Sequence, residues 1–274
     1  MNTQDIVIGE RVVALFKGDP CTGKTPAAAS YPDPYFFDFD GKMTSVKKMF
    51  PTKPVVYDRY FSFEPAYRRL KDWVEPCLVE EWVEGQKVVR VDPVAFSQRC
   101  PYKTLVLDSI TSFSGAIISN QVNERPKKTV RGGISTVEIQ DYGDEARGIT
   151  MFLDALCIVP VNVIVIAHVL KATISELQGG RRVTTETRTL LTAGQKIAAV
   201  IPKYFQEIYH FYCDTPMGAV GDDVRPAFKI CTFNTGTDFA TSALPLPGTI
   251  DFTNKSLYSE IQRYVEADKM VVRI

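Results

Sequence analysis

Two glycines, a lysine and a threonine near the start of the chain have the types and spacing of a phosphate-binding loop. Residues 18–25 read Gly-Asp-Pro-Cys-Thr-Gly-Lys-Thr and directly follow an apolar run. The glycines allow a tight loop whose backbone N–H groups converge on phosphate oxygens, and the helix expected from Lys24 adds its positive dipole end. Lys24 would place its charge on the β- and γ-phosphates, and the Thr25 hydroxyl would bind Mg²⁺. This P-loop pattern predicts that a nucleotide is held by Gly18, Asp19, Pro20, Cys21, Thr22, Gly23, Lys24 and Thr25.

Carboxylates end two further apolar runs, where they could hold a metal ion or orient water. The run 102–108 ends in Asp108 and has the form of a Walker B strand, whose aspartate holds Mg²⁺ largely through the water shell of the ion. Ser109 follows it, so no glutamate stands beside this aspartate, unlike in AAA+ motors. The carboxylate that orients the attacking water must come from elsewhere, and we expect it to be Asp40. The alternative for Asp40 is an ordinary turn residue at the end of a strand.

The elements that must position these residues alternate between strands and helices. An apolar strand is expected before the P-loop and at 34–40, 54–58, 102–108 and 161–168, with helices at 43–50, 64–75, 110–122 and 141–158. This order predicts an α/β fold, a P-loop NTPase with a mostly parallel central sheet flanked by helices. The acidic strand ends should share one sheet edge with the P-loop, where such folds bind ligands. A glycine turn between 78–83 and 86–91 predicts a peripheral β-hairpin insertion.

Composition limits the partners and the compartment. Lys and Arg number 32, as do Asp and Glu, so a nucleic acid must be held by local patches rather than by a global basic field. The six cysteines form no Cys-x-x-Cys pair, which disfavours zinc and disulfides and predicts reduced, mostly buried thiols. No apolar run approaches the length of a membrane span, so we expect a cytoplasmic protein without a membrane partner.

With the P-loop, the Asp108 strand and the His168 strand in this order, the chain resembles a RecA-like P-loop ATPase over residues 10–235. More narrowly, it resembles the RecA-type single-strand annealing proteins of phages. The resemblance implies one RecA-like domain over residues 1–274, with a C-terminal extension whose helix lies at about 255–267. It implies ATP and Mg²⁺ as cofactors, hydrolysis of ATP to ADP and phosphate, and a role in phage recombination, annealing or replication.

The resemblance also assigns catalytic roles to Lys24, Asp40 and His168. Asp40 stands where RecA has the glutamate that activates water, although it is a shorter acid. His168 stands where RecA has a polar sensor of the γ-phosphate, and its alternative role is a satisfied histidine at the core edge. The segment 234–242 lacks the basic residues that many relatives present across a subunit interface. A basic finger acting from this segment on a neighbouring subunit is therefore not expected.

RecA has two mobile DNA-binding loops, and the matching stretches here are 123–140 and 169–194. Their cations are Lys127, Lys128 and Arg131 in the first and Arg181 and Arg182 in the second. The implied partners are single-stranded DNA, a single-strand-binding protein and further copies of the chain in a ring or filament, in the host cytoplasm if the chain is phage-encoded. Solvated loop charges are the alternative for both clusters.

Two other functions fit the same motifs. In a small-molecule kinase, the stretch 169–194 would be a lid that brings Arg181 and Arg182 over the phosphates. In an ATP-switched assembly module, the nucleotide would change the shape of the protein with little turnover. The stretch 169–194 is longer than an ordinary connecting loop. We therefore expect it to be a functional loop, a hairpin or a disordered segment.

Overall fold

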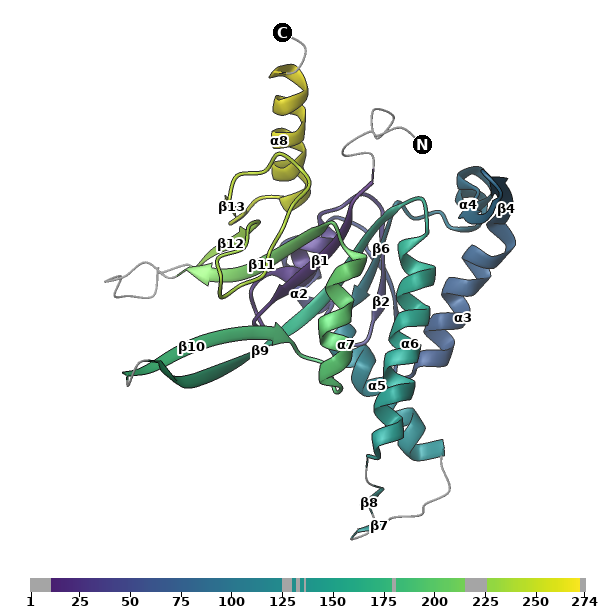
Figure 1. Ribbon diagram of the computed structural model, residues 1–274. Coiled ribbons are helices and arrows are strands. Elements are labelled where there is room, and N and C mark those ends of the chain that lie inside the picture. Colours follow the sequence, from purple (N-terminus) through teal and green to yellow (C-terminus); the bar gives the residue numbers. More distant parts are fainter. Residues whose placement is uncertain are drawn as a thin grey trace.

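A nine-stranded, mostly parallel sheet forms the centre of the computed structural model, which describes residues 11–124, 130–131, 134–135, 137–178, 181–214 and 226–271. The strand order is β13-β12-β11-β1-β9-β6-β2-β3, with β10 paired to β9 (Figure 1). The strands are β1 (Val13–Gly18), β2 (Pro34–Asp38), β3 (Val56–Arg59), β6 (Thr104–Asp108), β9 (Asn162–Gln178), β10 (Arg181–Leu190), β11 (Glu207–Asp214), β12 (Ala227–Cys231) and β13 (Thr249–Asp251). The neighbouring strands in the run β11-β1-β9-β6-β2-β3 pair in parallel, whereas β10, β12 and β13 run antiparallel to their neighbours. The predicted P-loop NTPase fold is confirmed.

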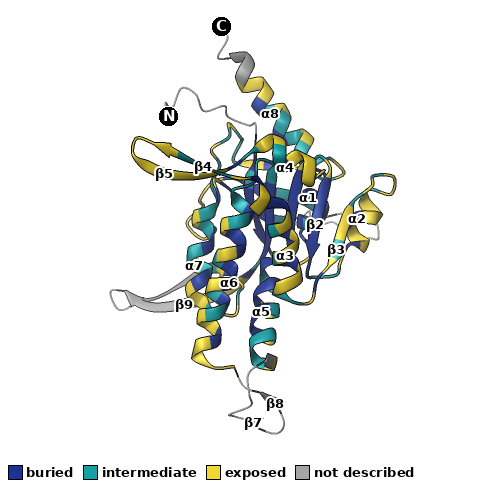
Figure 2. Cartoon of the chain, turned by 90° about the vertical axis from the view of Figure 1, so that its right-hand side faces the viewer, coloured by how far each residue is buried: buried dark blue, intermediate teal, exposed yellow. Residues whose placement is uncertain are grey.

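Helices bury both faces of this sheet, and strand residues alternate between the two cores. Leu15 packs into one core and its neighbour Phe16 into the other, as the two-residue period of a strand requires. One face is covered by α3 (Phe63–Val74), α4 (Pro93–Arg99), α5 (Ile110–Glu124), α6 (Ile139–Cys157) and α7 (Gln195–Val200), and the other by α1 (Lys24–Ala29), α2 (Thr44–Met49) and α8 (Leu257–Val271). Figure 2 shows the buried strand β2 between these layers. No helix in the described ranges is long and apolar enough to cross a bilayer.

The carboxyl ends of the central strands lie next to one another in the sheet, and this sets the position of the site. In the parallel register Gly18 lies beside His168 on β9, and Ile166 of the same strand lies beside Asp108. Asp38 is the partner of Asp108 on the other side of β6. The P-loop and the acidic strand ends therefore share the carboxyl edge of the sheet, as the alternation of elements predicts.

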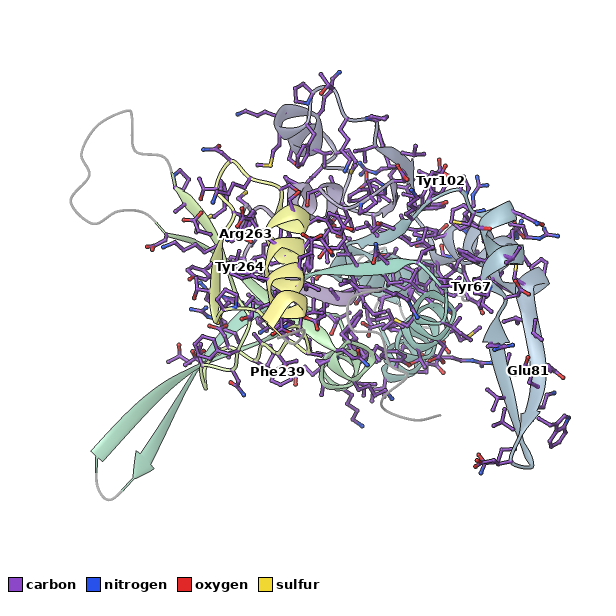
Figure 3. The ribbon with its side chains drawn as sticks, turned by 90° about the horizontal axis from the view of Figure 1, so that it is seen from above. Tyr67, Glu81, Tyr102, Phe239, Arg263 and Tyr264 are labelled. Atoms are coloured by element: carbon purple, nitrogen blue, oxygen red, sulfur yellow. The ribbon has the colours of Figure 1, made fainter. Side chains whose placement is uncertain are left out.

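A two-stranded hairpin stands at the periphery, as the sequence predicts. Its strands are β4 (Leu78–Val83) and β5 (Gln86–Val91), and Glu84 and Gly85 turn between them with φ of 51° and 79°. Figure 1, where β4 is labelled, and Figure 3, where Glu81 is labelled, show it on the opposite side of the molecule from the β9–β10 hairpin.

The stretch 169–194 is mainly a second hairpin, one of the three alternatives that the sequence leaves open. Strand β9 leaves the sheet after His168 and pairs with β10 from Val169↔Leu190 to Gln178↔Arg181. The first excursion is shorter than expected, because α5 continues to Glu124 and α6 begins at Ile139. Between these helices lie the two-residue strands β7 (Val130–Arg131) and β8 (Ile134–Ser135).

The cysteines are all free, and their burial is only partly as expected. Cys77, Cys100 and Cys231 are buried, and Cys157 is half-buried. The expectation of burial is wrong for Cys21 and Cys213, which are exposed because they lie in the P-loop and near the end of β11.

Candidate functional site

The two glycines of the P-loop are required by its packing. A Cβ atom on Gly18 would lie 2.3 Å from the carbonyl oxygen of Phe211, because β1 and β11 approach closely there. Gly23 has a φ of +84°, and a Cβ atom on it would lie 3.1 Å from the ring of Phe228. Both positions thus need a residue without a side chain. The loop between them turns tightly, and the Thr22 hydroxyl donates to the carbonyl oxygen of Asp19 at 2.8 Å.

Lys24 begins α1 and is only 5% exposed. Its Nζ atom donates to the carbonyl oxygens of Gly18 at 3.0 Å and Asp19 at 2.6 Å, and lies 3.3 Å from the Thr22 hydroxyl. Burial lowers the pKa of Lys24 to about 8, against the opposing effect of the Asp108 and Asp19 charges. The ammonium group therefore remains mostly charged at neutral pH and is held inside the loop by its own carbonyls.

Asp108 and Thr25 form a small group of oxygen ligands at the end of β6. The Thr25 hydroxyl donates to Asp108 Oδ2 at 2.8 Å, while the buried Oδ1 atom makes no hydrogen bond within the described residues. Burial, followed by the charge of Asp40, raises the pKa of Asp108 to about 7. A buried carboxylate oxygen without a partner is costly, and carboxylate and hydroxyl oxygens are ligands of the kind that Mg²⁺ takes. The pair therefore fits a Mg²⁺ ion.

The described residues contain no cluster of three or more His, Cys, Asp or Glu side chains that could hold a metal ion by themselves. This agrees with the habit of Mg²⁺, which keeps several waters and takes one or two protein carboxylates together with phosphate oxygens.

Asp40 follows β2 and is held by three side-chain donors. Its Oδ1 atom accepts the hydroxyl groups of Ser109, at 2.8 Å, and Ser112, and its Oδ2 atom lies 3.3 Å from His168 Nε2. Burial alone would raise the pKa of Asp40, but the hydrogen bonds from His168, Ser112 and Ser109 together hold it well below its usual value. Asp40 is therefore a carboxylate at neutral pH. Its Oδ2 atom retains a lone pair that can accept a hydrogen bond from water.

His168 reaches this site because of its place in β9. Ile166 packs into the core under α1, so the residue two positions later lies on the same face of the sheet. The backbone N–H group of His168 donates to the Thr111 hydroxyl at 3.0 Å, and its Nδ1 atom makes no hydrogen bond with the described residues. The first turn of α5 thus positions both His168 and Asp40, through Thr111 and Ser112 respectively.

These groups converge on a pocket of about 780 Å³. Predicted residues line one part of it: Pro20, Cys21, Thr22, Gly23, Lys24, Thr25, Asp40, Asp108 and His168. Gly18 and Asp19 do not line the pocket, but their carbonyl oxygens accept hydrogen bonds from Lys24. The remaining wall, which sequence reasoning missed, consists of Pro26, Lys42, Ser45, Lys48, Met49, Phe50, Ile166, Phe228, Asn254, Lys255 and Ser256. The lysines that follow Gly41 could have indicated part of this wall from the sequence alone. No local sequence pattern indicates that Phe228 or residues 254–256 line the pocket.

The expected DNA-binding cations lie largely outside the described residues. This holds for Lys127 and Lys128 and for the side chains of Arg131, Arg181 and Arg182. The backbone places Arg131 in β7 and both Arg181 and Arg182 at the start of β10. In Figure 1, β7 and β8 lie at the opposite end of the molecule from α8, and the β9–β10 hairpin projects from its left side.

Comparison with known proteins agrees with this geometry. A family model described as an AAA domain matches residues 10–223, which include the P-loop, Asp40, Asp108, His168 and the β9–β10 hairpin. A search of curated proteins finds no match to the chain. Since the matched segment covers most of the chain and contains the sheet edge where the pocket lies, the protein belongs to the AAA domain family and contains a nucleotide-binding domain of the P-loop ATPase type.

Proposed function

We propose that the protein binds ATP together with Mg²⁺ in this pocket and hydrolyses it. The observation that carries the proposal is the convergence of Lys24, the Thr25–Asp108 pair and the His168–Asp40 pair on one pocket, from four different parts of the chain. Phosphoryl transfer needs held phosphates, a metal ion and a group that orients the nucleophile, and these residues supply the three in turn.

In this mechanism the P-loop backbone and Lys24 hold the phosphates, and Thr25 and Asp108 hold Mg²⁺. The ion, when bound, neutralises charge that develops on the phosphate oxygens. Asp40 orients water through Oδ2 while its other contacts fix the carboxylate. Its low pKa makes it a weak base, but the loose transition state of phosphoryl transfer depends more on position than on proton removal. His168 holds Asp40 in place and is the expected sensor of the γ-phosphate.

The charge of Lys24 provides the test of nucleotide binding. Lys24→Ala removes a charge-assisted contact to phosphate, and we expect the affinity for ATP to fall by about tenfold or more. Calorimetric titration with ATP and Mg²⁺ measures this. Lys47→Ala is the matched control, because Lys47 is exposed on α2 and does not line the pocket. Equal affinity in wild type and Lys24→Ala would refute nucleotide binding at the P-loop.

We further propose that the ATPase acts on single-stranded DNA through the 123–140 and 169–194 excursions, as part of a homo-oligomer. The sequence resemblance and the cations of these stretches support this assignment. The β9–β10 hairpin projects away from the body of the molecule in Figures 1 and 3, which suits an external partner better than a lid over bound phosphates. A salt bridge of 2.7 Å between Lys171 at its root and Asp19 in the P-loop links the hairpin to the nucleotide site.

Salt-dependent DNA affinity separates this proposal from its alternatives. One variant replaces Lys127, Lys128 and Arg131 with alanine, and another replaces Arg181 and Arg182. Each lost phosphate contact should reduce the salt slope for single-stranded DNA by about 0.7. Fluorescence anisotropy at two salt concentrations, with and without ATP, measures the slope.

The control for these variants removes Lys87 and Arg90 from the β4–β5 hairpin, on the opposite side of the molecule. Wild-type affinity and slope in both loop variants would eliminate DNA as a partner while leaving ATP binding intact. Phosphate transfer to a small acceptor would instead indicate a kinase, and ATP binding without turnover would indicate an assembly module.

A further inference from the structure

Two exposed thiols lie side by side at the P-loop. Cys21 and Cys213 are separated by 192 positions in the sequence, yet Cys213 Sγ lies 3.6 Å from the carbonyl oxygen of Cys21. They are the two exposed cysteines of the chain. Neither thiol has a role in the hydrolysis proposed above.

The sheet register brings these thiols together. Strand β11 runs parallel to β1, and their last pair is Gly18 with Phe211. Beyond this pair β1 turns into the P-loop, whereas β11 continues to Asp214, so Cys213 lies alongside the loop. The partner of Cys213 on β12 is Phe228, whose ring faces Gly23. Cys213 is therefore part of the layer that covers the outer side of the loop.

The separation suits a covalent link. A carbonyl oxygen lies about 2.4 Å from the Cα atom of its own residue, so Cys213 Sγ is at most about 6 Å from Cys21 Cα. In a disulfide this Sγ–Cα distance is at most about 4.9 Å, the sum of the S–S bond of about 2.05 Å and the roughly 2.8 Å between a cysteine Cα atom and its own Sγ atom. The exposed Cys21 side chain can rotate toward Cys213, and a small movement of the loop completes the geometry.

We propose that Cys21 and Cys213 form a modification site, at which a peroxide oxidises the two thiols to a reversible disulfide that pins the P-loop to β11. One thiolate attacks a peroxide oxygen, the O–O bond breaks, and a sulfenic acid and hydroxide result. The second thiolate attacks the sulfenic sulfur, the S–S bond forms, and a second hydroxide leaves. With the two thiol protons these become two water molecules, and the peroxide accepts the two electrons that the sulfurs lose. A dithiol reductant reverses the reaction.

The effect on the pocket rests on the proposed nucleotide-binding function. A disulfide at Cys21 displaces the neighbouring backbone N–H groups of the P-loop, whereas Lys24 stays in place because it belongs to α1. The N–H groups and the Lys24 ammonium group then no longer contact the same phosphates together. Losing one or two hydrogen bonds from backbone N–H groups to a charged phosphate costs roughly a hundredfold in affinity, and we expect a loss of this order in ATP affinity on oxidation.

Peptide mapping tests the link without any nucleotide. The full chain is treated with hydrogen peroxide, its remaining thiols are alkylated, and it is digested with trypsin without reduction. We expect residues 18–24 linked to residues 204–229, with the link lost on treatment with a dithiol and in Cys21→Ser or Cys213→Ser. Cys77→Ser, which alters a buried thiol, should retain it. Separate oxidation of the two cysteines without a linked peptide would overturn the proposal.

A fluorescent ATP analogue tests the consequence. Oxidised wild type should bind it about a hundredfold more weakly than reduced wild type, whereas peroxide should leave the affinity of Cys213→Ser unchanged. Equal affinity in oxidised and reduced wild type, with the linked peptide present, would refute control of the loop by the disulfide. If the reduced protein fails to bind, the ATP proposal is wrong, and the linked peptide alone decides whether the thiol pair exists.

Discussion

Asp40→Asn separates nucleotide binding from the chemical step. The amide has nearly the same size as the carboxylate but keeps only one acceptor oxygen, and its NH₂ group cannot accept a hydrogen bond. If the oxygen stays with Ser109 and Ser112, the NH₂ group replaces the Oδ2 atom that faces His168. The water then loses its acceptor, while Lys24 and the P-loop keep every contact.

The expected loss is large in turnover and small in binding. Removing a positioned acid or base typically costs about 10²–10⁴ in kcat, or roughly 3–5 kcal/mol in the barrier. ATP affinity should stay within about threefold of wild type, because orienting water stabilises the transition state rather than bound ATP. The substitution also removes the Asp40 charge, which contributes to the raised pKa of Asp108. The pKa of Asp108 should therefore fall, and binding of ATP with Mg²⁺ should persist to lower pH than in wild type.

The assay combines steady-state phosphate release with calorimetric ATP titration at pH 6 and pH 8. Asp38→Asn is the matched control, because Asp38 is a buried carboxylate at the end of β2 that accepts a hydrogen bond from the Gly41 N–H group and does not line the pocket. It should lower stability without a selective loss of kcat. Unchanged turnover in Asp40→Asn would exclude Asp40 from the chemistry, and a parallel loss of binding and turnover would assign it to the metal or the fold.

Two further substitutions test the surroundings of the site. Burial lowers the pKa of His210 to about 4, below its ordinary value of 6.5, so its neutral form should stabilise the protein above pH 6.5 and that stability should be lost as pH falls toward 4. This difference in pKa corresponds to up to about 3 kcal/mol in the free energy of unfolding. Urea unfolding at pH 7 and pH 4.5 should therefore show a weaker pH dependence for His210→Gln than for wild type. An identical pH dependence would contradict this role of His210. Gly23→Ala forces a Cβ atom into a left-handed conformation against Phe228 and should cost about 1–2 kcal/mol in urea unfolding, with weaker ATP binding; wild-type stability would contradict the loop geometry.

Local sequence patterns were sufficient for the strands that carry the chemistry. Apolar runs mark β6 and the buried part of β9, and a two-residue period past Val106 and Ile166 places Asp108 and His168 on the α1 face. Helix α4 is not among the elements expected from apolar periodicity, although the sequence carries a start signal for it. Asp92 stands before Pro93, and its carboxylate accepts the N–H groups of Val94 and Ala95, as in an ordinary N-cap.

Other features depend on contacts between distant segments. Nothing near Ser112 indicates that its hydroxyl will reach Asp40, because that contact follows from the packing of α5 beside β2 and β6. The wall formed by Phe228 and residues 254–256 depends on where β12 and the start of α8 lie relative to the P-loop. The outer part of β9–β10 stands away from the sheet in Figure 1, and its sequence, rich in threonine and charged residues, lacks the apolar run of a central strand.

Strand β9 is at once an inner strand of the sheet and one arm of the long hairpin, and this gives it the mechanics of a lever. Its support is the sheet up to His168, and its free arm runs ten residues further to Gln178, or about 33 Å at the usual rise per residue. A tilt of about 5° at the support moves the far end by about 3 Å, the rise of roughly one residue along a strand. Lys171 meets Asp19 only three residues beyond the support, so if the hairpin tilts as a rigid body, a small displacement of the P-loop at this salt bridge becomes about three times larger at the far end.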